Sequence, residues 1–309
     1  MPFADELRAK YHDQWESMVT HPFVLEMGDG SLDIAKFRNY FRQDYVFCKD
    51  LVKLTSFAIA RAAPDYEAGK ILNGFLSNFL SAENDLFLNG FHDLGVTAEQ
   101  YLETEANPVT QGFGDFMVRT ALEGDFDDLI ALFYVTEGTY LDWAERLLNS
   151  GTQPNNAVYQ GWIDIHSPDV LGDVVAWFTE RLNDAGERAN ATKRANLERI
   201  FRTTLRYEYQ FWEACYHGRD WHDVGMASGV LATEYAAYEK MRAELEAKYT
   251  DEWVVVHGEE LVGVYTEFND AAREAGQRFG RGPYLIRQVA PTNWTEYARE
   301  LWQRRYAND

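Results

Sequence analysis

Hydrophobic residues recur every three or four positions from Met1 to about Trp221. One face of an α-helix returns about every 3.6 residues, so this spacing predicts a series of amphipathic helices. The clearest stripes contain Ile34, Phe37, Phe41, Tyr45, Cys48, Leu51 and Leu54; Phe75, Phe79, Leu80, Leu86 and Phe87; Leu129, Phe133, Tyr134, Tyr140 and Leu141; and Phe201, Leu205, Phe211 and Trp212. We therefore expect an all-α bundle over this part of the chain.

Proline and glycine interrupt the helical pattern where helices are expected to end or begin. These breaks fall at Pro64, Gly95, Pro108, Gly151 with Pro154, and Ser167-Pro168. The intervals between stripes are short, and we find no internal repeat and no low-complexity linker. The pattern thus predicts short connections between successive helices.

The pattern changes after one more expected helix, Val224 to Lys248. Two apolar runs, at residues 253–256 and 261–265, flank His257-Gly258-Glu259-Glu260 and predict a β-hairpin. The remaining expected elements are a helix from Phe268 to Phe279, a break at Gly280-Arg281-Gly282-Pro283, a strand from Tyr284 to Val289 and a helix from Asn293 to Tyr306. The fold class is therefore mainly α, with a small C-terminal ββαβ module.

Two domains follow from this change of period: a helical bundle over residues 1–221, and a connecting helix with the small module over residues 222–309. Three strands and one covering helix are near the lower limit for independent stability. We expect the strands to bury one apolar face against the helix from Phe268 to Phe279. The module should then dock on the bundle or on another subunit.

The chain is acidic, with 50 Asp and Glu residues against 29 Lys and Arg residues and a net charge of −21. Such a field repels phosphate backbones and anionic membranes, so we expect neither a nucleic-acid nor a membrane partner. The N-terminal residues are charged, which does not fit a signal peptide, and we expect a cytoplasmic protein. The acidity fits either a halophilic protein from a high-salt cytoplasm or an ordinary acidic one.

Four carboxylates interrupt the apolar stripes on four different expected helices: Asp44, Glu83, Glu137 and Glu208. A charged side chain is rarely buried without a partner, because desolvation of the charge is costly. One such acid is usually structural and paired across a helix interface. Four of them in one aromatic bundle favour convergence on a common pocket.

Such a pocket could hold metal ions or an organic ligand. Carboxylate-bridged two-metal bundles use Glu-x-x-His pairs, and this sequence contains none. The two cysteines, Cys48 and Cys215, lack metal-ligand spacing and are expected to be buried thiols. We therefore expect no metal and no other cofactor. Aromatic walls and carboxylates suit a flat heterocycle with ring nitrogens and an amine.

Several segments resemble the TenA/thiaminase II family. They are His21-Pro22-Phe23-Val24, residues 28–32 (GDGSL), residues 37–45 (FRNYFRQDY), residues 159–163 (YQGWI) and residues 207–212 (YEYQFW). The resemblance covers about Met1 to Trp221. It implies a heme-oxygenase-like helical fold, a homotetramer, and salvage of thiamin by hydrolysis of aminomethyl- or thiazole-substituted 4-amino-2-methylpyrimidines.

The same resemblance implies roles for individual residues. Asp44 would bind the pyrimidine amine and ring nitrogen, and Glu208 would be the acid and base for the transferred proton. Tyr140 and Phe211 would line the ring. Further substrate contacts are expected from Glu83, from Phe47 and Phe113 where the family often has tyrosines, and from His166, which replaces another tyrosine.

One departure from the family pattern concerns the nucleophile, because Thr136 stands where most members have a cysteine. A hydroxyl without an adjacent base is a poor nucleophile. The neighbouring Glu137 could instead activate water as a general base. Three hypotheses follow: an aminopyrimidine hydrolase of thiamin salvage, a pyrimidine-binding or regulatory protein without catalysis, and a metal-dependent oxidase on the same fold.

Overall fold

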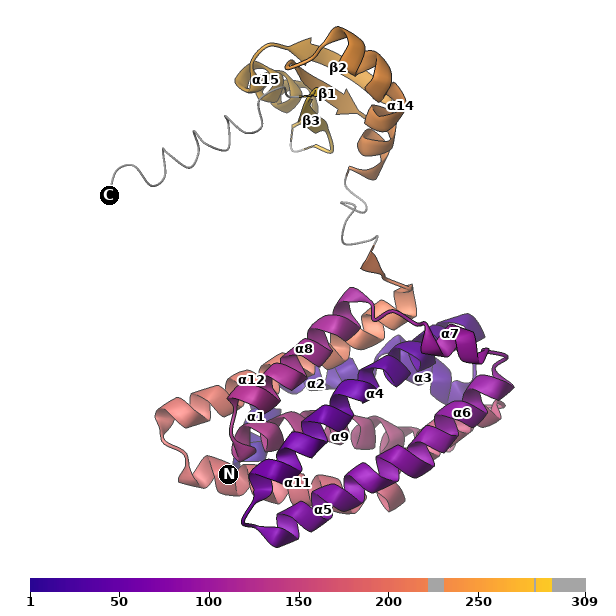
Figure 1. Cartoon of the computed structure of the whole chain (residues 1–309), viewed down its shortest axis with the longest axis vertical. Helices are drawn as coiled ribbons and strands as arrows, with labels where there is room; N and C mark the ends of the chain where they lie inside the picture. The colour runs from indigo at the N-terminus through magenta and orange to yellow at the C-terminus, as the bar shows by residue number, and fades with distance from the viewer. Residues whose placement is uncertain (222–230, 281, 291–309) are drawn as a thin grey trace. The chain divides into compact units, whose positions relative to one another are not determined.

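The chain divides into two units, Met1–Asp220 and Trp221–Asp309 (Figure 1). The computed structural model describes residues 1–221, 231–280 and 282–290. The first unit is built from helices, and the described residues of the second form a three-stranded sheet with two helices. The prediction of a mainly α chain with a small ββαβ module is therefore confirmed. No helix in the described ranges is both long and apolar enough to span a bilayer.

The first unit contains twelve α-helices and one π-helical turn among its described residues. Their bounds are α1 (Phe3–Lys10), α2 (His12–Val19), α3 (Pro22–Asp29), α4 (Ile34–Ala62), α5 (Tyr66–Asn78), η1 (Phe79–Glu83), α6 (Asn84–Asp93), α7 (Ala98–Leu102), α8 (Pro108–Glu123), α9 (Phe126–Asn149), α10 (Ala157–Ile165), α11 (Pro168–Arg188) and α12 (Ala191–His217).

The helix ends follow the punctuation of the sequence. Helix α4 ends two residues before Pro64, and α8 and α11 begin at Pro108 and Pro168, where a proline loses no intrahelical hydrogen bond. At the start of α9, Asp125 accepts from the backbone N–H of Asp128 and completes a capping box. These local signals fix where each long helix begins, and hence which of its residues face inward.

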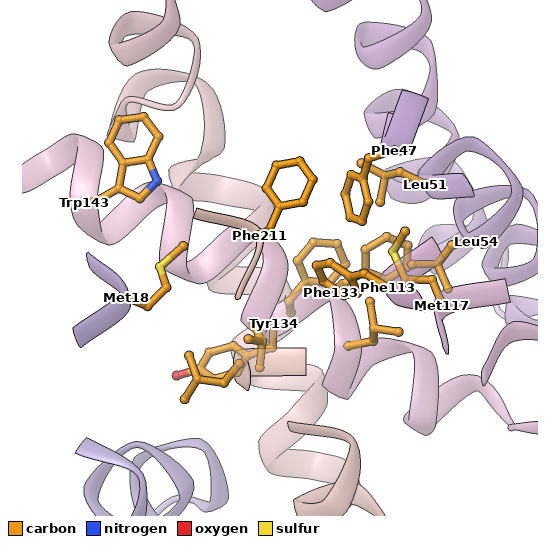
Figure 2. Close-up of a cluster of buried hydrophobic side chains, with 14 of the residues drawn as sticks. Met18, Phe47, Leu51, Leu54, Phe113, Met117, Phe133, Tyr134, Trp143 and Phe211 are labelled. Carbon is orange, nitrogen blue, oxygen red and sulfur yellow. The ribbon is translucent and has the colours of Figure 1, made fainter. Parts of the chain in front are cut away.

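Helix α9 lies at the centre of the bundle, packed against α2, α4, α8, α11 and α12. Every residue from Asp128 to Thr139 is buried, as expected for a helix that is apolar around most of its circumference. Phe133 of α9 stacks on Phe178 of α11 with ring centroids 5.1 Å apart. Figure 2 shows the neighbouring cluster, in which Phe47 of α4 lies beside Phe113 of α8. This packing holds the inward-facing acids in fixed positions.

The π-helical turn η1 separates α5 from α6 and changes the expected apolar stripe. Phe79 and Phe87 are buried, but Leu80 is 55% exposed, so the prediction that Leu80 lies on the buried face is wrong. A π-helical turn accommodates one additional residue, which delays the rotation of the helix by about 100°. Phe79 and Phe87 therefore share one face, and Glu83 lies between them.

The second unit is a sheet with one helix on each face. Its elements are α14 (Ala232–Lys248), β1 (Trp253–His257), β2 (Glu260–Tyr265), α15 (Phe268–Phe279) and β3 (Leu285–Gln288). The strand order is β2-β1-β3, and both pairings are antiparallel. The expected helix from Asn293 to Tyr306 and the first residues of the expected helix from Val224 lie outside the described residues.

Both faces of the sheet are covered, which corrects the expectation of a single buried face. Val254 and Val256 pack with Tyr238 of α14, whereas Val255 packs with Ala271 and Ala275 of α15. Neighbouring residues of a strand point to opposite faces, so the continuous valine run reflects burial on both sides. The helix assigned as a connection thus supplies half of the core of this unit.

This arrangement predicts different behaviour for two truncations. A chain ending at Asp220 should keep its helical circular dichroism signal and a single cooperative thermal transition, because the large core lies within residues 1–220. A chain ending at Lys248 should aggregate instead, since it exposes the Tyr238 and Leu245 side chains that the sheet covers. Light scattering after refolding distinguishes the two. Aggregation of the shorter chain would contradict the prediction.

Candidate active site

A narrow cavity of about 50 Å³ lies within the helical unit. Its walls come from α4, α5, η1, α9, α10, α11 and α12. The lining residues are Asp44, Phe47, Cys48, Leu51, Phe75, Asn78, Phe79, Glu83, Thr136, Glu137, Tyr140, Trp162, Ile165, His166, Val170, Leu171 and Glu208. All four acids singled out in the sequence line this one cavity, and no lysine or arginine is among these described lining residues.

Asp44 is held by a chain of hydrogen bonds between helices. The Tyr40 hydroxyl, one turn earlier on α4, lies 3.4 Å from Asp44 Oδ2 and donates to it. Trp162 Nε1 donates to the Tyr40 hydroxyl over 3.1 Å, and the Tyr140 hydroxyl lies 3.2 Å from it. Buried tyrosine and tryptophan side chains normally bond their polar atoms in this way. The chain fixes the Asp44 carboxyl group at the cavity wall.

Glu137 and Thr136 form a second polar pair. The Thr136 hydroxyl lies 3.2 Å from Glu137 Oε1 and also 3.2 Å from the Phe133 carbonyl oxygen, to either of which it can donate. The expectation of a hydroxyl without an adjacent base is therefore corrected, since a carboxylate lies beside it. Either the hydroxyl or a bound water could lose a proton to Glu137.

Burial dominates the electrostatics of the four acids, because a charged carboxylate is poorly solvated inside the bundle. Burial and, to a smaller extent, the nearby Glu137 raise the pKa of Asp44 to about 8. The hydrogen bond from Tyr40 opposes this shift. Burial raises the pKa of Glu137 to about 7, opposed by the Thr136 hydrogen bond. The pKa values of Glu83 and Glu208 are raised well above the usual range by burial and by Asp44 and Glu137.

The shifts of Asp44 and Glu137 predict that the free energy of unfolding falls by about 3 kcal/mol between pH 6.5 and 8.5. The folded protein keeps protons on Asp44 and Glu137 that the unfolded chain has released, so this stabilisation is lost as the pH rises through about 7 and 8. The pKa values of His21 and His166 are lowered, so these residues make the free energy of unfolding rise with pH. They do so only below pH 6.5, the ordinary pKa of histidine. Urea denaturation at constant salt measures the slope, and Glu137→Gln should flatten it. A slope that rises with pH would contradict the assignment.

His166 caps the C-terminus of α10 and presents a neutral ring to the cavity. Its Nδ1 lies 2.7 Å from the Trp162 carbonyl oxygen, so Nδ1 carries the proton and Nε2 is an acceptor. Burial lowers the pKa of His166 to about 4, although the bond to the carbonyl opposes this change. At neutral pH the ring therefore adds a hydrogen-bond acceptor and no positive charge.

Three phenylalanines were expected in the site, and they lie at two different depths. Phe47 lines the cavity, whereas Phe113 and Phe211 are not among its lining residues, and their expected contacts with the substrate stay predictions. Their ring centroids lie 4.8 and 5.6 Å from that of Phe47 (Figure 2). All three share the inward side of their helices, and packing decides which of them reaches the cavity. Phe113 and Phe211 support the Phe47 ring from behind.

The cysteines are buried, as expected, but only Cys48 lines the cavity. Burial and the nearby carboxylates raise the pKa of Cys48 well above its usual range, which keeps the thiol protonated and weakly nucleophilic. Cys215 lies outside the lining, although it was expected to face the pocket. Within the described ranges, no group of three histidine, cysteine, aspartate or glutamate side chains is arranged to hold a metal ion.

Sequence reasoning did not assign roles to Tyr40, Trp162 or Asn78. Tyr40 and Trp162 organise Asp44, and Asn78 adds an amide to the lining at the end of α5. A buried tyrosine one turn before a buried acid was the available signal for Tyr40. The contact with Trp162 joins residues 122 positions apart, which periodicity along one helix does not reveal.

Comparison with known proteins adds to this geometry. Residues 8–218 match the TENA/THI-4/PQQC family. An aminopyrimidine aminohydrolase of Halalkalibacterium halodurans is 29% identical over 225 residues, which cover 73% of this chain and 100% of the relative.

Two solved structures share the fold. A TenA homologue from P. horikoshii OT3 is 23% identical with a TM-score of 0.62, covering 71% of this chain and 100% of that one. A domain with a heme oxygenase-like fold from Shewanella denitrificans is 14% identical with a TM-score of 0.56, covering 73% and 96%. The expected heme-oxygenase-like bundle is therefore confirmed.

Proposed function

Since the chain belongs to the TENA/THI-4/PQQC family, we propose that it is a hydrolase of thiamin salvage acting on 4-amino-2-methylpyrimidine derivatives. The observation that carries this proposal is the convergence of four carboxylates on one narrow aromatic cavity without a lysine or arginine in its described lining. A flat heterocycle with several N–H donors and basic ring nitrogens complements such a lining. The activity of the H. halodurans relative agrees with it.

Asp44 is suited to bind the aminopyrimidine edge. Its pKa of about 8 keeps the carboxyl group largely protonated at neutral pH in the free protein. A neutral carboxyl group offers one donor and one acceptor, which match a ring nitrogen and the adjacent amine of the pyrimidine. Tyr40 would orient this group, and Phe47 and Tyr140 would contact the faces of the ring.

The proposed reaction replaces the group on the methylene carbon attached to the pyrimidine. The oxygen of a water molecule bonds to this carbon while the carbon–nitrogen bond breaks. The nitrogen, which is protonated before the bond breaks, takes the bonding electron pair and leaves as neutral ammonia or as a neutral amine. Glu137 accepts the proton that the water loses. Glu208 gives a proton to a ring nitrogen, which makes the methylene carbon more electron-poor, and takes the proton back when the product forms.

A panel of three compounds tests the proposal: 4-amino-5-aminomethyl-2-methylpyrimidine, its N-formyl derivative and thiamin. Turnover of at least one to the hydroxymethylpyrimidine supports a hydrolase. Tight binding of a pyrimidine without turnover would replace it with the alternative of a pyrimidine-binding or regulatory protein. Oxidised products formed only with added metal would favour the metal-dependent oxidase, and metal analysis of the purified protein complements that measurement.

We also propose that the protein assembles as a homo-oligomer, either the tetramer that the resemblance to the family implies or a dimer. The net charge of −21 favours adaptation to high salt, because dissolved salt screens repulsion between surface carboxylates. Sedimentation velocity measures the mass of the assembly. Thermal melting in increasing potassium chloride measures the effect of salt. A melting temperature that does not change with salt would contradict adaptation to high salt.

A further inference from the structure

We infer that Glu83 binds the leaving amine of the substrate as an ammonium ion, and so selects substrates that carry a free primary amine on the methylene carbon. This inference rests on the proposed function and assigns the amine-binding part of the same cavity. It starts from the bonding of the four acids. Asp44 bonds Tyr40 and Glu137 bonds Thr136, whereas Glu83 and Glu208 have no hydrogen-bond or ion-pair partner among the described residues.

The two unpaired acids lie at different places in the cavity. Glu83 stands on η1 and Glu208 on α12, and both line the cavity together with Asp44 of α4 and Glu137 of α9. A ligand whose ring is bound at Asp44 therefore lies in the same cavity as both unpaired acids. With Glu208 assigned to the ring proton, Glu83 remains for the substituent.

The cavity that Glu83 lines suits a small cation. Phe75, Phe79 and Leu171 contribute apolar walls, and the neutral His166 ring adds no positive charge. An ammonium ion placed there gains from an unscreened carboxylate and would lower the pKa that burial raises. A thiazolium ring also carries a positive charge, but it offers no N–H donor to the Glu83 carboxylate.

The chemistry of the leaving group points in the same direction. Cleavage of the carbon–nitrogen bond places the electron pair on nitrogen, so a protonated amine departs as ammonia whereas an unprotonated one would have to leave as an amide anion. A carboxylate beside the amine favours its protonated form before bond cleavage. Glu83 would thus contribute to selectivity and also to the reaction rate. The N-formyl derivative lacks this charge.

Binding by titration calorimetry tests the inference with a matched pair of ligands, the aminomethyl pyrimidine and its neutral hydroxymethyl counterpart. The measurements use the full chain carrying Glu208→Gln, which blocks turnover. Adding Glu83→Gln should weaken binding of the amine about 10- to 100-fold, as for the loss of a charge-assisted hydrogen bond, while the alcohol changes little. Glu103→Gln, at an exposed position, is the matched control and should alter neither affinity.

Equal losses for both ligands, or no preference for the amine before Glu83 is changed, would overturn the inference. Glu83→Gln should melt at or above the temperature of its parent, because the neutral amide avoids the cost of burying a carboxylate. Glu83→Asp, which keeps the charge but shortens the side chain, should give an intermediate loss. If neither pyrimidine binds and none of the three compounds is turned over, the proposed function fails as a whole. Turnover with equal affinities refutes only the role of Glu83.

Discussion

Glu208→Gln should reduce kcat by about 10²- to 10⁴-fold while leaving the Kd for the hydroxymethylpyrimidine nearly unchanged. The amide keeps the shape of the side chain but cannot exchange a proton, and general acid–base catalysis contributes a factor of this size. Glu208 is buried on α12, lines the cavity, and has a pKa raised well above the usual range by burial and by Glu137 and Asp44. Glu208 therefore favours its protonated form more than an exposed glutamate does, and it can donate that proton.

Steady-state kinetics with the best substrate of the panel, together with calorimetric binding of the product, measures the two effects separately. Glu187→Gln on α11 is the control, because Glu187 is exposed and its removal tests the chemical change alone. Turnover within about threefold of the unmodified enzyme would exclude proton transfer by Glu208. A parallel loss of kcat and product binding would make Glu208 a binding residue only.

Glu137→Gln should lower kcat/KM by about 10²-fold or more and remove the acidic limb of its pH profile. A general base must be deprotonated before it accepts a proton, so activity should rise with pH through about 7, the pKa to which burial raises Glu137. The glutamine variant has no such group and should lack this rise. Rates measured from pH 5.5 to 8.5 give both the size of the loss and the shape of the profile.

Substitutions at Thr136 separate water activation from attack by the hydroxyl. Thr136→Ala should retain activity within about tenfold if Glu137 activates water, because the alanine removes only the hydrogen bond between the two side chains. An inactive Thr136→Ala would instead make the hydroxyl the nucleophile. Thr136→Cys, which restores the residue of most family members, should add cleavage of thiamin by providing a better nucleophile.

The four acids of the cavity could be predicted because each one interrupts the regular helical spacing of apolar residues on its own helix. Asp44, Glu83, Glu137 and Glu208 stand on apolar stripes, and a charge on a buried face demands a partner or a ligand. The four side chains lie along one cavity for the same reason. Periodicity places a residue on a face of its own helix, however, and not at a depth. It therefore did not separate Phe47, at the cavity wall, from Phe113 and Phe211 behind it.

Contacts between distant helices were likewise outside the reach of the pattern. The hydrogen bonds that join Trp162 and Tyr140 to Tyr40 depend on how α10, α9 and α4 pack together. The same holds for the second unit, where α14 reads as a connection in sequence but covers one face of the sheet. The few apolar residues of such a helix do not show which element it packs against. That assignment needs the surface of the neighbouring element.

The additional residue in the π-helical turn η1 also determines what the deletion of a single codon would do. A deletion of one codon between Phe79 and Glu83 would turn the wide turn into an ordinary helical one and rotate Glu83 relative to the preceding helix. Asp44, Glu137 and Glu208 belong to other helices and would keep their codons and their places. The carboxylate that η1 contributes to the cavity can therefore be lost in a single mutational step while the other three acids stay in place.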